Sequence, residues 1–243
     1  MTVGQDSTAR RDEVAAGLAR VEERIASACR AAGRLRGDVQ LIVVTKRFPG
    51  SDIEALCELG VTDIGENRDQ EASTKIAALP HDVRQRLQVH FIGQLQSNKA
   101  HSLANYVDSV HSIDRDKLVT ALDRAAGAAG RDIGALVQVS LGAGPTAVGR
   151  GGIPLDGVAE LANSVAAAPH LTLRGLMAVA PLGVDAGEAF AQLDRVARAV
   201  RAEHPEATWV SAGMSADLEA AVAHGATHLR VGSAILGSRP PVG

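Results

Sequence analysis

The sequence alternates between short apolar runs and segments with helical spacing, and it does so eight times. The apolar runs are rich in Val, Ile and Leu, which is typical of strands buried in a parallel sheet. This alternation predicts an α/β fold, a single (β/α)8 TIM barrel, rather than a six-stranded doubly wound sheet. The expected strands are residues 39–46, 61–65, 87–93, 106–111, 135–141, 173–179, 208–211 and 228–232.

The length of the chain leaves no room for a second domain. One barrel of this kind needs most of the 243 residues. We therefore expect a flexible N-terminal tail over residues 1–8 and one barrel domain over residues 9–243. The barrel domain should begin with a long amphipathic helix that ends at Gly33.

Composition argues against several classes of function. The formal charge is −3 and the chain has three Phe, one Tyr and one Trp, which predicts no binding of nucleic acid. The N-terminus has no apolar signal core and no run long enough to span a bilayer, so we expect a soluble, cytoplasmic protein that binds no membrane. Cys29 and Cys57 lack the spacing of metal ligands and are expected to be buried free thiols. Gly225 separates His224 from His228, so no metal site is expected.

The first expected strand, Val39-Gln-Leu-Ile-Val-Val-Thr-Lys46, stops at a lysine. Binding and catalytic groups collect at the carboxyl ends of barrel strands, so Lys46 is a candidate for an imine with an aldehyde. Lysines also close strands simply because they can reach solvent, and position alone does not decide between these interpretations.

Two late segments have the composition of an anion-binding site. Glycines and hydroxyl side chains occur together in Ser211-Ala-Gly-Met-Ser-Ala-Asp217 and in Arg230-Val-Gly-Ser-Ala234. Backbone N–H groups and serine hydroxyls at these positions suit a phosphate, and barrels often bind phosphate after strands seven and eight. A single Gly-x-Ser sequence is a weak signal, since turns contain it often. With Lys46 on the neighbouring first strand, the pattern suggests pyridoxal 5′-phosphate (PLP).

Motifs along nearly the whole chain carry a resemblance to a known family. The chain resembles the YggS/PROSC family of PLP homeostasis (PLP-binding) proteins, which are single barrels of PLP fold type III, like the N-terminal domain of alanine racemase. The matching residues are Val44-Thr-Lys46, Gly65-Glu-Asn67 with Gln70-Glu71, His90-Phe-Ile-Gly-Gln-Leu-Gln96 with Asn98-Lys99, Gly175-Leu-Met177, Ser211 with Gly213-Met-Ser215 and Asp217, and Arg230 with Gly232.

The resemblance implies roles for residues of this chain. Lys46 would form a Schiff base with PLP, Asn67 would lie beside the ring, and Arg230 would face the pyridine nitrogen. A guanidinium does not give up its proton at ordinary pH, so that nitrogen should stay unprotonated and the ring should be a weaker electron sink. Other cofactor-binding residues would be Met177 and Met214 near the cofactor and, around the phosphate, Ser211, Gly213, Ser215, Gly232 and Ser233.

Three places depart from the family pattern. Arg68 stands where a tyrosine is usual, and Ala212 replaces a methionine. Around the fifth strand, Gln138 and the glycine-rich segment 142–152 replace an Asn-containing strand and a loop with Glu and Lys. The segment lacks the glycine spacing of nucleotide-binding loops, so we expect a mobile lid or surface loop.

Two functions follow from a PLP barrel. The resemblance implies a non-enzymatic carrier that holds PLP and releases it to PLP-dependent apoenzymes. The alternative is a PLP-dependent amino-acid racemase, which needs a second base opposite Lys46. The chain's single tyrosine, Tyr106, is expected at the start of strand four, away from the carboxyl ends, which favours the carrier. A phosphate-binding barrel enzyme without PLP is a third interpretation. With no swapped active-site residue, a monomer is expected.

Overall fold

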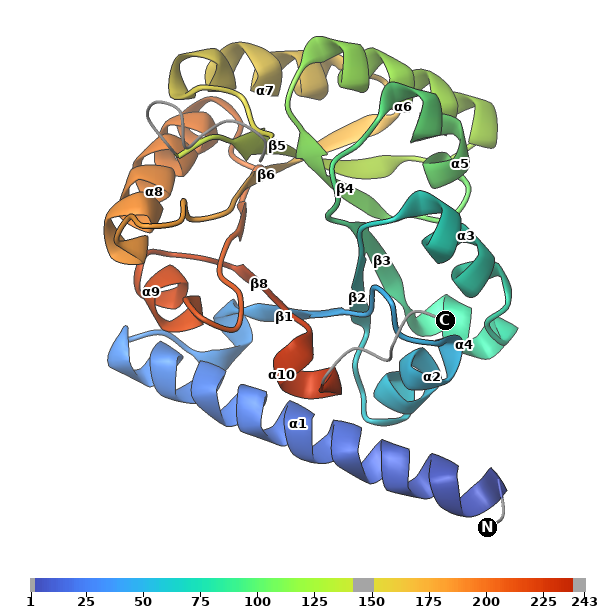
Figure 1. Cartoon of the computed structure of the whole chain (residues 1–243). Helices are drawn as coiled ribbons and strands as arrows, with labels where there is room; N and C mark the ends of the chain where they lie inside the picture. The colour runs from blue at the N-terminus through green and yellow to red at the C-terminus, as the bar shows by residue number, and fades with distance from the viewer. Residues whose placement is uncertain (1–2, 142–150, 238–243) are drawn as a thin grey trace.

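Eight parallel strands form a closed barrel in the computed structural model, which describes residues 3–141 and 151–237. The strands follow one another around the barrel in chain order, and β1 pairs with β8 (Figure 1). The predicted (β/α)8 fold is confirmed. The strands are β1 Gln40–Val44, β2 Asp63–Glu66, β3 Gln88–Phe91, β4 Ser109–Ile113, β5 Ile133–Val139, β6 Leu171–Ala178, β7 Trp209–Ser211 and β8 His228–Val231.

Helices surround the barrel on its outside (Figure 1). Local signals fix several of their ends: Asp185 accepts a hydrogen bond from the backbone N–H of Glu188 at the start of α8, and Gly130, with φ of 63°, ends α6. The α-helices described are α1 Val3–Ala31, α2 Gly50–Glu58, α3 Asp69–Ala77, α4 His81–Arg86, α5 Ala100–Ala104, α6 Asp116–Ala129, α7 Val158–Ala167, α8 Ala186–Glu203, α9 Leu218–Ala223 and α10 Ser233–Leu236. Short 3-10 helices are η1 Arg36–Asp38, η2 Ser97–Lys99 and η4 Leu155–Gly157.

The first helix is longer than expected and joins the two ends of the described chain. It begins at Val3, within the stretch expected as a tail, and no proline interrupts that stretch before Ala9. Helix α1 packs against α9 and α10 (Figure 1). Arg10 donates to the carbonyl of Leu236 at 3.0 Å, and Arg24 forms an ion pair with Glu219.

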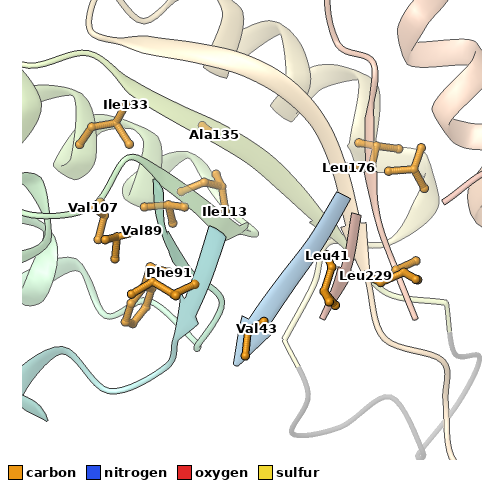
Figure 2. Packing of buried hydrophobic residues seen from close by; sticks show 14 of the residues in the cluster. Leu41, Val43, Val89, Phe91, Val107, Ile113, Ile133, Ala135, Leu176 and Leu229 are labelled. Carbon is orange, nitrogen blue, oxygen red and sulfur yellow. The ribbon is translucent and has the colours of Figure 1, made fainter. Parts of the chain in front are cut away.

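Buried side chains form two layers that follow the alternation of the strands. Outward-facing residues such as Leu41, Val43 and Leu229 pack under the helices as one continuous apolar core (Figure 2). Inward-facing residues are largely polar: His111 on β4 bonds to Ser211 on β7 across the barrel. Such an interior differs from the stacked Val, Ile and Leu layers usual in this fold.

None of the helices in the two described ranges is long and apolar enough to cross a membrane.

Candidate functional site

Lys46 lies just beyond the carboxyl end of β1, at the mouth of the barrel where it was expected. It is half-buried. The preceding Thr45 is tied to β2, since its backbone N–H donates to the carbonyl of Gly65 at 3.0 Å and its hydroxyl donates to Glu66 at 2.6 Å. These bonds hold the base of Lys46 against the neighbouring strand.

The turn after Lys46 has an unusual backbone conformation. Arg47 has φ of 67°, and it is the only non-glycine residue with positive φ among those described. Lys75 of α3 holds this turn from outside, because its ammonium donates to the carbonyls of Thr45 and Phe48, each at 2.9 Å. Glu71 accepts a hydrogen bond from the backbone N–H of Arg47. The strained turn is therefore fixed on both sides of Lys46.

A buried ion pair anchors this support. The ammonium of Lys75 lies 2.7 Å from Glu66, and both side chains are buried. Burial raises the pKa of Glu66, and the charge and hydrogen bond of Lys75 offset part of that effect. The other carboxylate oxygen of Glu66 is buried and has no hydrogen-bond partner.

Arg230 on β8 is held at a fixed place inside the mouth. Its guanidinium donates to the hydroxyl of Ser211 at 2.7 Å and to the carbonyl of Ala178 at 2.8 Å. Burial lowers the pKa of Arg230 to about 10, with Asp217 acting in the opposite direction, so the group stays charged at neutral pH. A guanidinium has five N–H bonds, so three are left to donate to a ligand.

The hydroxyl of Ser211 has a different environment from the one expected for a phosphate ligand. It lies 2.7 Å from Arg230, which can only donate, and 2.9 Å from Nδ1 of His111. Arg230 therefore uses one lone pair of the hydroxyl oxygen, and His111 is the second partner of the hydroxyl.

The two loops expected to hold phosphate lie next to each other. The backbone N–H of Arg230 donates to the carbonyl of Gly213 at 3.0 Å, which joins the β7–α9 loop to β8. Gly213 has φ of 91°, and a side chain there would collide with Ala221. A side chain at Gly232 would press on Val44 of β1. Both glycines are thus needed for packing, whether or not a phosphate binds.

The remaining side chains predicted in these loops are partly open to solvent. Met214 is 38% exposed, its backbone N–H donates to Asp217 at 2.6 Å, and Ser215 is half-buried. Ser233 is exposed at the first turn of α10. Met177, by contrast, is buried on β6 beside Ser211 of β7.

Asn67 follows β2 at the same mouth and carries an unused acceptor. Its side-chain oxygen is buried and has no hydrogen-bond partner. A side chain at Gly93 would collide with the backbone of Asn67, so the glycine after β3 lets the two strand ends approach. A buried acceptor without a donor is costly, and a ligand hydroxyl or N–H would satisfy it.

A cleft of about 1420 Å³ lies beside the mouth, next to the turn of Arg47. It shares Asn67 with the predicted site. Its walls combine basic, aromatic and amide side chains, among them Arg47, Arg68, Phe48, Phe91, Gln94 and Gln96.

Sequence reasoning missed one group of polar residues and could not place others. His90 and His111 are buried and belong to a hydrogen-bonded network inside the barrel that was not expected from the sequence. The signal was the alternation of polar residues in β4 and β8, at Ser109 and His111 and at His228 and Arg230. Most of the glycine-rich segment, residues 142–150, lies outside the described residues. The histidines weighed as metal ligands diverge: His228 stacks on Trp209 inside the barrel, and His224 ends α9.

Comparisons with known proteins agree with this geometry. Residues 17–240 match the family described as alanine racemase, N-terminal domain. The pyridoxal phosphate homeostasis protein of Mycobacterium tuberculosis (strain ATCC 25618 / H37Rv) is 41% identical over 243 residues, covering 95% of this chain and 94% of that protein. The structure of PipY from Synechococcus elongatus PCC7942 with PLP bound has a TM-score of 0.77 and 34% identity, covering 92% of this chain and 100% of PipY. Alanine racemase from Corynebacterium glutamicum has a TM-score of 0.67 at 15% identity, covering 96% of this chain and 62% of its own, and shares the fold.

Proposed function

Since the chain belongs to the family of pyridoxal phosphate homeostasis proteins, we propose that it holds PLP as a Schiff base on Lys46 and releases it to apoenzymes without catalytic turnover. The observation that carries the proposal is the meeting of Lys46, Asn67 and Arg230 at one barrel mouth. Each follows or ends a different strand, and β1 pairs directly with β8.

The residues present fit the cofactor. Lys46 supplies the amine for the aldehyde, the buried oxygen of Asn67 lacks a donor, and Arg230 keeps N–H groups for a ring nitrogen. The β7–α9 loop and the start of α10 supply backbone N–H groups for the phosphate at Gly213, Ser215, Gly232 and Ser233, and Met177 and Met214 would pack near the ring.

Arg230 makes the site a poor place for carbanion chemistry. When bound, PLP acts as an electron sink whose strength depends on protonation of its ring nitrogen. Arg230 can only donate, and its pKa of about 10, lowered by burial, keeps it charged at neutral pH. It therefore holds that nitrogen without protonating it, which suits storage better than turnover.

The tyrosine that the racemase alternative would need is not available as a base. Tyr106, the chain's single tyrosine, donates to Asp69 at 3.3 Å. Burial, together with the charge of Asp69, raises the pKa of Tyr106 further above its ordinary value. A phenol held in this way does not exchange protons at neutral pH.

Release to apoenzymes needs an open approach to Lys46. The cleft lined by Arg47, the neighbour of Lys46 in the chain, and by Asn67 is the candidate for this approach. We propose that the protein acts as a monomer in this role.

Replacing Lys46 tests the site. The protein loaded with PLP should absorb in the visible range, and borohydride followed by mass spectrometry should place a pyridoxyl group on the Lys46 peptide. Lys46→Ala should lose both signals, whereas Lys99→Ala, which changes a lysine of the neighbouring cleft, should keep them.

Retained modification in Lys46→Ala would refute the assignment of the lysine. A racemisation assay with several amino acids on the same loaded sample separates the two functions, and steady turnover would refute the carrier.

A further inference from the structure

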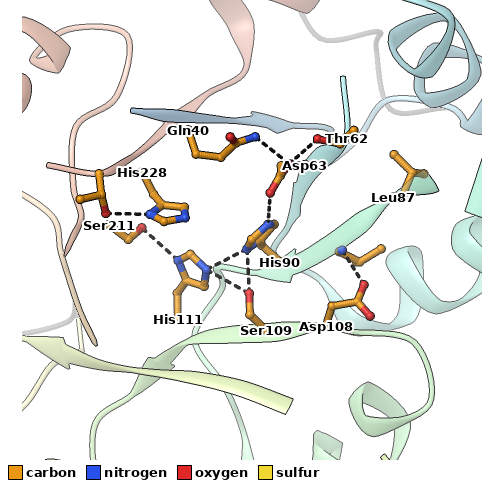
Figure 3. Close-up of polar contacts among 12 residues, drawn as sticks. Gln40, Thr62, Asp63, Leu87, His90, Asp108, Ser109, His111, Ser211 and His228 are labelled. Atoms are coloured by element: carbon orange, nitrogen blue, oxygen red, sulfur yellow. Dashed lines mark hydrogen bonds and ion pairs between the residues drawn. The ribbon is translucent and has the colours of Figure 1, made fainter. Parts of the chain in front are cut away.

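A continuous chain of hydrogen bonds crosses the barrel from Arg230 at the mouth to Asp63 at the opposite end, and Figure 3 shows its part from Ser211 to Asp63. From Arg230 it passes to Ser211, then 2.9 Å to Nδ1 of His111. Nε2 of His111 lies 3.0 Å from Nδ1 of His90 and 3.2 Å from the hydroxyl of Ser109, which is itself 2.7 Å from Nδ1 of His90. The chain ends where Nε2 of His90 lies 2.9 Å from Asp63.

The two ends of this chain have opposite and fixed roles. Arg230 can only donate. Burial alone would raise the pKa of Asp63, but hydrogen bonds from His90 and Thr62 outweigh it and lower that pKa, so the carboxylate is ionised and only accepts. Its second oxygen accepts from Gln40 at 2.7 Å and from Thr62 at 2.6 Å.

The donor end fixes the proton of His111. Ser211 accepts from Arg230, and the other partner of its hydroxyl in the network is Nδ1 of His111, so a bare Nδ1 gives the Ser211 proton an acceptor. Burial lowers the pKa of His111 well below its ordinary value, helped by His90 and by the charge of Arg230, so the ring is neutral. Its single proton is therefore on Nε2, where it points toward Ser109 and His90.

Asp63, at the accepting end of the network, determines which nitrogen of His90 carries the proton. As in His111, that nitrogen is Nε2. Asp63 accepts from Nε2, which leaves Nδ1 of His90 to accept from Ser109. The reversed arrangement would put a proton on Nδ1 of both rings. The hydroxyl of Ser211 would then accept twice, and its proton would have no acceptor among the bonds of the network, a costly state for a fully buried group.

We propose that Asp63 is a positioning residue for Arg230. From the far end of the barrel it determines which partner donates in each hydrogen bond of the network, so that Ser211 presents a lone pair to the guanidinium. The inference rests on the proposed function only in taking Arg230 as the residue that faces the cofactor. Asp63 itself touches no ligand.

The substitution Asp63→Asn reverses this direction without changing the shape of the side chain. The amide oxygen stays with its two donors, Gln40 and Thr62, and the amide N–H₂ turns to His90. His90 then carries its proton on Nδ1, His111 follows, and Ser211 receives a donor from both sides. The bond between Ser211 and Arg230 is weakened as a result.

Nitrogen NMR of the histidine rings in the ligand-free protein shows which ring nitrogen carries the proton, and therefore the direction of the hydrogen bonds. In the wild type, His111 should carry its proton on Nε2 with Nδ1 bare, and His90 should be protonated on Nε2. In Asp63→Asn the proton should move to Nδ1 of both rings. The matched control, Gln40→Leu, removes a donor to Asp63 but keeps the ionised acceptor, so both rings should keep the wild-type tautomer.

Binding of PLP supplies the second readout. Loss of one hydrogen bond to the guanidinium should weaken PLP binding roughly tenfold in Asp63→Asn and leave Gln40→Leu within about twofold of the wild type. A protonated Nδ1 on His111 in the wild type would overturn the inference even if the variant failed to fold. Unchanged tautomers or unchanged affinity in a folded Asp63→Asn would overturn it too.

The two proposals fail separately. Wild-type protein that shows the expected tautomers but binds no PLP would refute the proposed function and leave the hydrogen-bond direction in place. Wild-type protein that binds PLP through Lys46, with both rings protonated on Nδ1, would refute only the role of Asp63.

Discussion

His228 shows at the scale of one residue how the polar barrel interior affects stability. Its ring stacks on Trp209 with centroids 4.1 Å apart, and Nδ1 lies 2.8 Å from the hydroxyl of Thr227. Burial, aided by His90 and by the charge of Arg230 and opposed by Asp63, lowers the pKa of His228 to about 3. The folded protein therefore keeps this ring neutral where an unfolded chain would protonate it.

Acid should destabilise the fold through His228. Between the unfolded pKa of about 6.5 and the folded pKa of about 3, the unfolded chain binds the extra proton, so stability falls as pH falls through that window. From about pH 7 to pH 5 the loss attributable to this ring is about 2 kcal/mol. Urea unfolding of the wild type and of His228→Phe, which keeps an aromatic ring on Trp209, measures it.

The variant should lose less stability than the wild type over that range. Equal losses in the two proteins would contradict the assignment of this pH dependence to His228.

The β1–α2 loop shows, at the scale of an element, how a helix shapes a site that it does not enter. Lys75 lies on α3, yet it binds two carbonyls of the loop that contains Lys46 and neutralises the buried Glu66. The positive φ of Arg47 persists because these contacts hold the turn around it.

Lys75→Met should therefore destabilise the protein by roughly 3–5 kcal/mol, since it leaves Glu66 buried without its counterion. Pairing it with Glu66→Gln should restore part of the loss. Lys99→Met changes an exposed lysine whose ammonium lies 3.7 Å from Asp69, and it should cost less than about 1 kcal/mol. Urea unfolding of each variant measures these changes in the free energy of unfolding. A small loss in Lys75→Met alone would show that Glu66 is neutral in the folded protein.

Elements were predictable where a local signal sets them. All eight strands follow from apolar runs. Strand β4 was placed too early, because Tyr106 and Val107 are apolar but their N–H groups bond to the end of α5. The strand also extends past residue 111, its expected end, to Ile113. Helix α4, which directly follows Pro80, was not expected from the sequence.

The site was predictable in position but not in its internal contacts. Lys46, Asn67 and Arg230 follow from strand ends and motifs, since parallel strands bring their carboxyl ends together. The contact of Ser211 with His111 could not be predicted, because it requires β4 and β7 to face each other across the barrel at a known register. Asp63 was missed for the same reason.

At the scale of the whole molecule, α1 acts as a brace for the end of the barrel that carries Gly232 and Ser233. It packs along α10, and at Gly17 the two helices approach so closely that a side chain would collide with the carbonyl of Ile235. Arg10 adds hydrogen bonds to Leu236 and to Asp52 of α2.

Gly17→Ala should destabilise the protein, although alanine favours helices over glycine by about 1 kcal/mol. The collision with Ile235 should outweigh that gain and, by moving α10, weaken PLP binding. Gly50→Ala is the matched control, since its nearest neighbour would be an ordinary contact at 3.5 Å and it should be neutral or stabilising. Thermal unfolding and PLP titration of both variants measure this, and a stabilised Gly17→Ala would contradict the brace.

The pairing of α1 with α9 and α10 also bears on how the protein is made. Arg24 and Glu219 are separated by 195 residues, and Arg10 and Leu236 by 226. During synthesis α1 leaves the ribosome long before α9 and α10 have been made. The part of its apolar face that packs against them therefore stays exposed for most of translation. The barrel can close only after β8 has emerged, because β1 pairs with β8.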